Sequence, residues 1–372
     1  MSVSARFVNA LTAGAPLRRA AVAASILFLV ALVGCGFQGE PVPPTVVPIP
    51  TPAPRPTAEP PAAVSGWYLG AQSEETVRVR ADLTAAEVDI LTKRLAARYP
   101  ELSVRWQRGP DANLLQDTLN EARAGTPDWD IYVGDSGPAL KTARQALRWT
   151  PPEARTIHVS LFDAEGSWYA IASTLQVIQY HTEQVPPDYV PPSYDALRHP
   201  GYAGRLAIED LNLTWLKGLV EVRGREGASD LIRALARQAV TFRRDARSLV
   251  AFVTAGEQAV AINARMDAVE RERRNGGKTA WVGPDPVIVQ PLAMVVSAST
   301  DRPNAAKLVA NFLLSPDAQT ALAAAGRAPS RADVDPDPQS LLRGLRAHVT
   351  LPPEGPAERD LRELWQELWG RR

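Results

Sequence analysis

Short strand-like segments alternate with longer helix-like segments along most of the chain. Residues 77–80 alternate apolar and charged side chains, the period of a strand, and residues 84–99 follow with Val88, Leu91 and Leu95 on one helical face. The same patterns predict further strands at 102–106, 130–133, 167–172, 174–180, 205–208, 259–263 and 286–297, and further helices at 111–122, 212–222, 229–238, 247–255, 304–314 and 316–325. Alternation of this kind is typical of an α/β protein.

The last of these helices has the clearest boundaries. Ser315 is a suitable N-cap, Pro316 occupies the first helical position, and Gly326 follows the end. Farther on, residues 356–372 place their large apolar side chains on one helical stripe, formed by Leu361, Leu364, Trp365, Leu368 and Trp369. We expect this C-terminal helix to dock on the folded part. An exposed stripe would instead be a surface for a partner.

The N-terminus predicts export. Residues 1–19 contain three arginines and no acidic residue, and the apolar run at 20–33 is shorter than the roughly 20 residues of a membrane-spanning helix. Such a run is typical of a signal peptide, here residues 1–34. Leu32-Val33-Gly34-Cys35 resembles a bacterial lipobox, which predicts cleavage before Cys35 and acylation (palmitate or a similar chain) of its thiol. The other interpretation is an anchor helix with an incidental cysteine.

A proline-rich tether follows. Ten prolines lie between Pro41 and Pro61, which excludes helix and central strand and favours extended polyproline II. The tether is predicted to occupy residues 35–65, so that the folded part begins near Gly66 and stands away from the membrane. Cys35 is the only cysteine, so the folded part must be stable without a disulfide.

Charge and motifs exclude several classes of function. The chain has 41 basic and 41 acidic residues, and removal of the signal peptide leaves 38 basic ones. This balance argues against a nucleic-acid partner, which requires a concentrated basic face. The sequence has no GxSxG or HExxH motif and none of the phosphate-binding glycine patterns. We therefore expect neither an enzyme nor a cofactor.

The order of segments over residues 95–334 resembles the periplasmic solute-binding proteins of ABC importers, in the group with iron(III)-, polyamine- and phosphonate-type members. The most specific passage is Pro303-Asn-Ala-Ala-Lys-Leu308 with Phe312-Leu-Leu-Ser-Pro316 and Gln319. Other passages that carry the resemblance are 98–106, 121–132, 164–169, 177–180, 192–208 and 255–257.

The resemblance implies an α/β fold of two lobes joined by hinge strands, with a small-molecule solute bound in the cleft between them. The first lobe would comprise residues 66–170 and 286–345, the second 171–285, and 346–372 would form the C-terminal helical segment. The protein would deliver its solute to an ABC permease and its ATPase. We expect a monomer outside the cytoplasm, attached to the membrane by its lipid alone.

Candidate ligand-binding residues lie in loops after strands, where open α/β sheets bind ligands. They are Asp82, Thr84, Arg108, Asp135 and Ser136 in the first lobe, Asp210, Thr214, Trp215, Asn263 and Arg265 in the second, and Trp168 and Tyr169 near the crossing. Arg265 could bind a carboxylate or phosphonate through two hydrogen bonds. Some have a structural alternative: Asp82 or Thr84 as a helix cap, Trp215 as core, and Arg265 as the start of a solvated charged helix.

These residues predict an organic solute that is anionic or zwitterionic. Iron(III) members of the group have a tandem tyrosine after the strand that here ends at Asn263, where this sequence has Ala264-Arg265-Met266. The four histidines, at 158, 181, 199 and 348, do not have the spacing of metal ligands. An iron- or metal-binding role is therefore the alternative, as is a binding-fold lipoprotein that signals to a membrane sensor.

Overall fold

The computed structural model describes residues 62–334 and 344–370. The predicted signal peptide, Cys35 and the tether up to residue 61 lie outside the described residues. Helix α1 (Ala62–Ala71) begins four residues before the predicted start of the folded part, and Trp67 and Ala71 on it are buried. None of the described helices is both long and apolar enough to cross a membrane.

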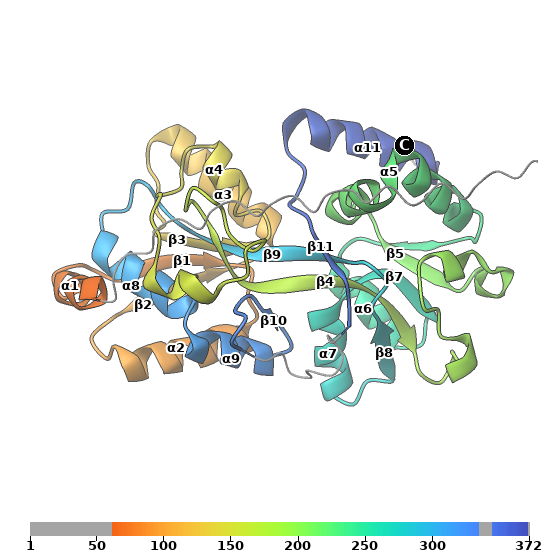
Figure 1. Ribbon diagram of the computed structural model, residues 1–372, viewed down its shortest axis with the longest axis horizontal. Helices are drawn as coiled ribbons and strands as arrows, with labels where there is room; N and C mark the ends of the chain where they lie inside the picture. The colour runs from red at the N-terminus through yellow and green to blue at the C-terminus, as the bar shows by residue number, and fades with distance from the viewer. Residues whose placement is uncertain (1–61, 335–343, 371–372) are drawn as a thin grey trace, which may run out of the picture. The chain divides into compact units, whose positions relative to one another are not determined.

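A mixed sheet of eleven strands runs through the described part of the chain (Figure 1). Its main order is β2-β1-β3-β9-β4-β7-β5-β6, with β8 and β10 paired to β4 and β11 paired to β9. The strands are β1 (Val77–Ala81), β2 (Val104–Arg108), β3 (Ile131–Gly134), β4 (Tyr169–His181), β5 (Leu206–Glu209), β6 (Thr241–Arg243), β7 (Val260–Arg265), β8 (Thr279–Val282), β9 (Val287–Val296), β10 (Ala328–Pro329) and β11 (Ala347–Val349).

Strands β4 and β9 pair antiparallel and connect the two halves of the sheet. The prediction of two successive strands at 167–172 and 174–180 is wrong, because one continuous strand, β4, spans the region. Its register with β9 shifts between Ala170 and Ala172, which marks a bulge rather than a break.

Helices cover both faces of the sheet in each half (Figure 1). Those of the first half are α1, α2 (Ala85–Arg98), α3 (Asp111–Ala124), α4 (Ala139–Thr142), α8 (Pro303–Leu313) and α9 (Pro316–Ala324), and those of the second are α5 (Leu213–Ala236), α6 (Ala246–Thr254), α7 (Met266–Arg274) and α11 (Gly355–Trp369). Short 3-10 helices span Pro152–Thr156, Pro187–Tyr189, Asp195–Arg198 and Pro200–Tyr202. The two helices predicted at 212–222 and 229–238 both lie within α5, where Gly224 between them has a non-helical backbone (φ 72°, ψ 160°).

Each half of the sheet has its own buried core, and the boundary between the two cores crosses strands β4 and β9. On β4, Ala172 packs in the core of the first half and Leu175 in that of the second. On β9, Leu292 belongs to the first core and Val289 to the second. The fold is therefore two α/β lobes joined by hinge strands.

The C-terminal helix α11 docks on the second lobe beside α5, as predicted (Figure 1). All five residues of its apolar stripe are buried. The Trp365 ring meets that of Trp215 edge to face, with centroids 6.3 Å apart.

Candidate functional site

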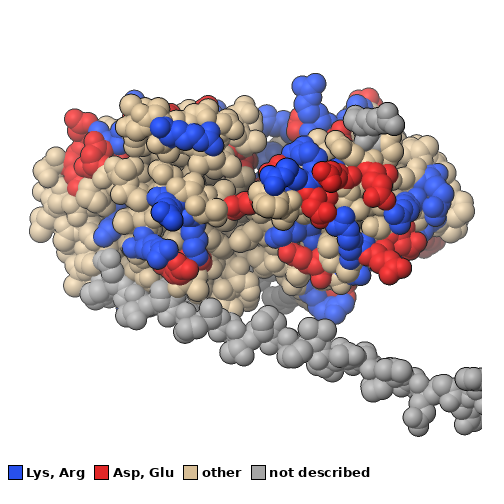
Figure 2. Space-filling model, turned by 90° about the horizontal axis from the view of Figure 1, so that it is seen from above, with Lys and Arg blue, Asp and Glu red and all other residues tan. Residues whose placement is uncertain are grey.

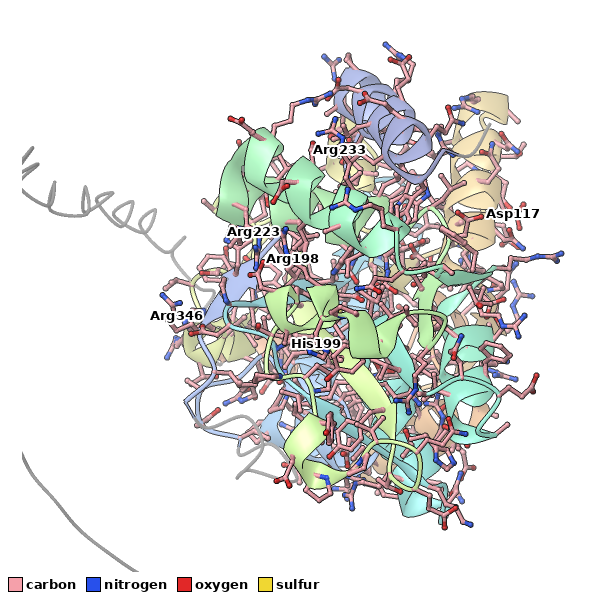
Figure 3. The ribbon with its side chains drawn as sticks, turned by 90° about the vertical axis from the view of Figure 1, so that its right-hand side faces the viewer. Asp117, Arg198, His199, Arg223, Arg233 and Arg346 are labelled. Carbon is pink, nitrogen blue, oxygen red and sulfur yellow. The ribbon has the colours of Figure 1, made fainter. Side chains whose placement is uncertain are left out.

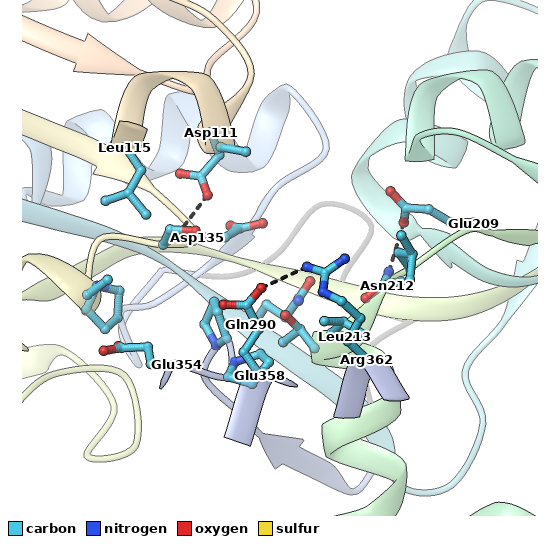
Figure 4. A pocket seen from close by; sticks show the side chains of 18 of the residues that line it. Asp111, Leu115, Asp135, Glu209, Asn212, Leu213, Gln290, Glu354, Glu358 and Arg362 are labelled. Carbon is cyan, nitrogen blue, oxygen red and sulfur yellow. Dashed lines mark hydrogen bonds and ion pairs between the residues drawn. The ribbon is translucent and has the colours of Figure 1, made fainter. Parts of the chain in front are cut away.

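A cavity of about 540 Å³ lies between the lobes. Its size is in the range of small-molecule sites, about 300–1,000 Å³. The first lobe contributes the start of α3 and the loop after β3, the second the ends of β5 and β7 and the starts of α5 and α6. The hinge strands contribute Gln176 and Gln290, and the segment Pro352–Arg362 forms a further wall. Figure 4 shows the side chains that line it.

Strand ends bring the key charged residues together. Asp135 follows β3, Glu209 ends β5 and Arg265 ends β7. Strand β5 runs parallel to β7, so Glu209 and Arg265 lie at the same edge of the second lobe. Strand β3 is linked to β7 through β9 and β4 by three antiparallel pairings, so it runs in the opposite direction to β7 and its carboxyl end, with Asp135, faces that edge.

Arg265 joins the two lobes through its guanidinium group. Its Nη1 lies 3.3 Å from Asp135 Oδ2, and its Nε lies 3.3 Å from Asp267 Oδ1. Its Nη2 donates to Thr174 Oγ1 at 3.0 Å. Burial alone would lower the pKa of Arg265, but Asp267 and Asp135 outweigh it and the pKa is raised. The positive charge is therefore already offset by carboxylates of the protein.

Asp135 has a buried carboxylate oxygen that the described part of the chain leaves unsatisfied. Only 14% of its side chain is exposed. Burial raises the pKa of Asp135 to about 7, although Arg265 opposes the shift. Its Oδ1 is buried and has no hydrogen-bond partner among the described residues. A buried acceptor of this kind is rare in folded proteins, which makes it a natural partner for a donor on a ligand.

Asp111 fixes the loop that carries Asp135. Its carboxylate accepts a hydrogen bond from Tyr132 Oη at 2.7 Å and one from the Ser136 backbone N–H at 3.0 Å. A Cβ at Gly134 would overlap this carboxylate, so the close approach requires glycine there.

Glu209 is the corresponding carboxylate of the second lobe. Burial raises the pKa of Glu209 to about 7, although a hydrogen bond from Asn212 opposes the shift. Asn212 Nδ2 donates to Glu209 Oε2 at 2.8 Å. The backbone N–H of Glu209 donates to Asn263 Oδ1 at 2.9 Å, so Asn263 positions the strand end.

The hinge strands contribute two amides to the cavity. Gln176 Nε2 on β4 donates to Gln290 Oε1 on β9 at 2.8 Å. Gln176 Oε1 is buried without a partner among the described residues. Like Asp135 Oδ1, it is an acceptor that a ligand N–H could satisfy.

A second group of buried charges lies next to Arg265. Arg327, which follows α9, pairs with Glu87 at 2.6 Å and approaches Asp267 Oδ2 at 3.5 Å. Burial alone would raise the pKa of Asp267, but Arg265 and Arg327 lower it to about 2. Asp267 is therefore ionised and neutralises two arginines, one from each lobe.

Acidic residues outnumber basic ones around the cavity. Its lining includes five carboxylates, on Asp111, Asp135, Glu209, Glu354 and Glu358, and two guanidinium groups, on Arg265 and Arg362. On the outer face shown in Figure 2, by contrast, acidic and basic side chains are interspersed. The excess of negative charge in the cavity has no counterpart on that face.

Four of the predicted candidates line the cavity: Asp135, Ser136, Thr214 and Arg265. The structure does not bring the others there. Thr84 forms the capping box of α2, and Arg108 lies on the exposed end of β2. Trp168 and Trp215 are buried in core clusters. Tyr169 Oη donates to the Trp149 carbonyl, Asp210 Oδ1 accepts from Trp365 Nε1, and Asn263 Oδ1 accepts from the Glu209 N–H. Burial raises the pKa of Asp82, although the charges of Arg265 and Arg327 oppose the shift.

Several lining residues were not predicted. Glu209 ends a strand one position before the chosen Asp210, and strand ends shift by a residue or two between assignments. Asp111 is the first residue of α3, after the N-cap Pro110, and its side chain turns to the loop after β3. No group of three His, Cys, Asp or Glu residues in the described part of the chain could hold a metal ion.

Comparison with known proteins places the chain in a family. The model of the bacterial extracellular solute-binding proteins matches residues 149–347, more than half of the 372 residues. The chain belongs to this family. It is a solute-binding protein of an ABC importer, a binding protein for transport rather than an enzyme. Proteins of this family act outside the cytoplasm and deliver a small molecule to a permease and its ATPase.

Solved structures share the fold of this solute-binding protein. Iron-bound HitA from Pseudomonas aeruginosa is 19% identical, with a TM-score of 0.66 over 79% of this chain and 99% of that one. A substrate-binding protein of an ABC transporter from Agrobacterium tumefaciens is 16% identical, with a TM-score of 0.69 over 80% of this chain and 96% of that one. AfuA from Actinobacillus pleuropneumoniae, with fructose-6-phosphate bound, is 14% identical, with a TM-score of 0.61 over 80% of this chain and 97% of that one. The search of curated proteins gives no match.

Proposed function

We propose that this solute-binding protein captures a small organic solute that carries a positively charged nitrogen, and that a zwitterion fits the cavity best. The observation that supports this most directly is Asp135, whose Oδ1 is a buried acceptor without a partner in the described residues. An ammonium group would supply the missing donor and a compensating charge.

The charge of the cavity favours the zwitterion over the anion. Five carboxylates line the space against two guanidinium groups, and Arg265 is already paired with Asp135 and Asp267. A purely anionic solute would be repelled by these carboxylates and would have to compete with them for Arg265. Like charges at close range in a partly desolvated site are strongly unfavourable.

A charge series tests the proposal. We would measure binding of α,ω-diamines, ω-amino carboxylates and α,ω-dicarboxylates of three to six carbons to the full chain by calorimetry at pH 8. The compounds with an ammonium group are expected to bind and the dicarboxylates are not. A ligand at 100 times its Kd stabilises a protein by about 2.7 kcal/mol, so thermal unfolding gives a second readout. Selective binding of dicarboxylates would contradict the proposal.

We also propose that the protein is a monomer held at the membrane by acylated Cys35, with residues 35–61 as tether. The lipobox and the run of prolines support this. Metabolic labelling with a palmitate analogue should label the native chain but not Cys35→Ser. A labelled variant, or an unlabelled native chain, would argue against the anchor.

A further inference from the structure

The C-terminal segment forms a wall of the cavity that lies outside the family match. Residues 352–355, Glu358 and Arg362 line the cavity, whereas the match ends at residue 347.

This segment is fixed to both lobes. Strand β11 pairs in parallel with the hinge strand β9, and the Thr350 N–H donates to the Val289 carbonyl at 2.9 Å. Leu351 packs against the first-lobe cluster that contains Leu114 and Trp129. Its carbonyl accepts a hydrogen bond from Lys217 Nζ, on second-lobe helix α5, at 2.9 Å. The wall is therefore part of the fold.

Helix α11 holds its cavity-facing residues in a defined position. Its buried stripe packs against α5, and two exposed ion pairs flank the contact: Arg225 with Asp360 at 2.7 Å and Arg233 with Glu367 at 3.0 Å. Arg233 is labelled in Figure 3. Glu358 and Arg362 extend from the helix into the space between the lobes (Figure 4). They lie one turn apart, with Arg362 Nη2 2.8 Å from Glu358 Oε1.

The two arginines of the cavity differ in what they can offer to a ligand. Arg265 donates through Nε, Nη1 and Nη2 to acceptors of the protein and is largely buried between two carboxylates. Arg362 has 44% of its side chain exposed and a single carboxylate, Glu358, beside it. An exposed ion pair is weak and readily shared with another carboxylate.

We infer that Arg362 binds the anionic group of a zwitterionic solute, while Asp135 binds its ammonium group. The inference rests on the proposed function and adds the specificity-determining residue to it. Glu354 and Glu358, which also line this wall of the cavity, disfavour a second anionic group on the solute. The C-terminal helix thereby selects a zwitterion over both a dication and a dianion.

The test compares two charge classes of ligand on matched variants of the full chain. The Kd of the best-bound ω-amino carboxylate and of the diamine of equal length would be measured for the native chain, Arg362→Ala and Arg362→Lys. Arg359→Ala, an exposed arginine on the same helix that does not line the cavity, is the control. Arg362→Ala should raise the Kd of the amino carboxylate at least tenfold and leave the Kd of the diamine unchanged or lower. Arg362→Lys should recover part of the loss because it keeps the charge.

The outcomes separate this inference from the proposed function. If Arg362→Ala changes both Kd values equally, or neither, the role of Arg362 is wrong while the need for an ammonium group stands. If the native chain binds diamines but no amino carboxylate, the same conclusion holds. If it binds neither class, both proposals are wrong. Should Arg362→Ala unfold, Arg362→Gln replaces it, since glutamine keeps much of the side-chain length without the charge.

Discussion

Arg265 of the second lobe and Asp135 of the first form an ion pair across the cavity, with Nη1 3.3 Å from Oδ2. A second pair crosses between the lobes nearby, from Arg327 to Asp267 at 3.5 Å. Both pairs lie where the lobes meet beside the hinge strands. The first of these pairs lines the cavity, so a solute there would meet charges that join the lobes.

Removal of Arg265 should destabilise the protein, whereas stabilisation by an ammonium ligand should persist because Asp135 remains to bind it. Arg265→Ala leaves the carboxylates of Asp135 and Asp267 without their shared partner. Loss of one member of a buried ion pair is unfavourable by about 3–5 kcal/mol. Urea unfolding at pH 8 measures the change in unfolding free energy, and thermal unfolding with the best-bound probe measures the ligand effect.

A double variant separates charge pairing from packing. If the loss comes from unpaired charge, Asp135→Asn with Arg265→Ala should be less destabilised than the sum of the two single changes. Strict additivity of the two effects would show that the ion pair contributes little.

Asp135 should be the main determinant of ammonium binding. Asp135→Asn keeps the shape of the side chain and removes its charge. A charged hydrogen bond contributes about 1.5–3 kcal/mol, so diamine affinity should fall roughly tenfold or more. Asp117→Asn, an exposed carboxylate on α3 of the same lobe, should leave the Kd unchanged. Equal Kd values for the native chain and Asp135→Asn would remove the main support for the proposed ligand class.

Periodicity in the sequence predicts most of the fold because the buried strands and amphipathic helices have strong local signals. The cap Ser315 and the glycine at 326 mark α9 as predicted. The bulge in β4 could not be predicted, since it arises from pairing with β9, more than a hundred residues away. Strand β11 has only three residues and forms through its partner β9.

The site is less predictable because its residues converge from distant segments. Asp135 and Arg265 could be chosen from their place after strands, but the ion pair between them depends on how the lobes meet. Trp215 has the same apolar pattern whether it lines a cavity or a core, and its burial against Trp365 depends on the docking of α11. The contribution of Arg362 to the cavity depends on the same docking.

Ligand affinity should rise with pH. Burial raises the pKa values of Asp135 and Glu209 to about 7, so both carboxyl groups are protonated in the empty cavity below that pH. An ammonium group binds their ionised forms and must displace protons. The Kd for a diamine should therefore fall by up to tenfold per pH unit for each group between pH 5 and 7, and level off above pH 8. Calorimetry across this range measures it.

The stability of the empty protein should change in the opposite direction. Between the ordinary carboxyl pKa near 4 and the raised values near 7, the folded state binds more protons than the unfolded state. The contribution of these two groups to the unfolding free energy therefore falls as pH rises through this range. Asp135→Asn should reduce the pH dependence of both the diamine affinity and the unfolding free energy. A diamine affinity that is independent of pH would contradict ionisation of these groups on binding.

Helix α11 should be needed for the cavity as well as for stability. Trp365→Ala removes a ring that is 1% exposed and packs against Trp215 and Trp369. Large-to-small changes of this kind destabilise a protein by about 3–5 kcal/mol. The same change loosens the helix that positions Arg362, so amino-carboxylate affinity should fall more than diamine affinity. Leu69→Ala, at a side chain that is 67% exposed, should change neither the stability nor the ligand affinities. Retention of the native preference between the two ligands in a folded Trp365→Ala variant would show that the cavity forms without a fixed C-terminal wall.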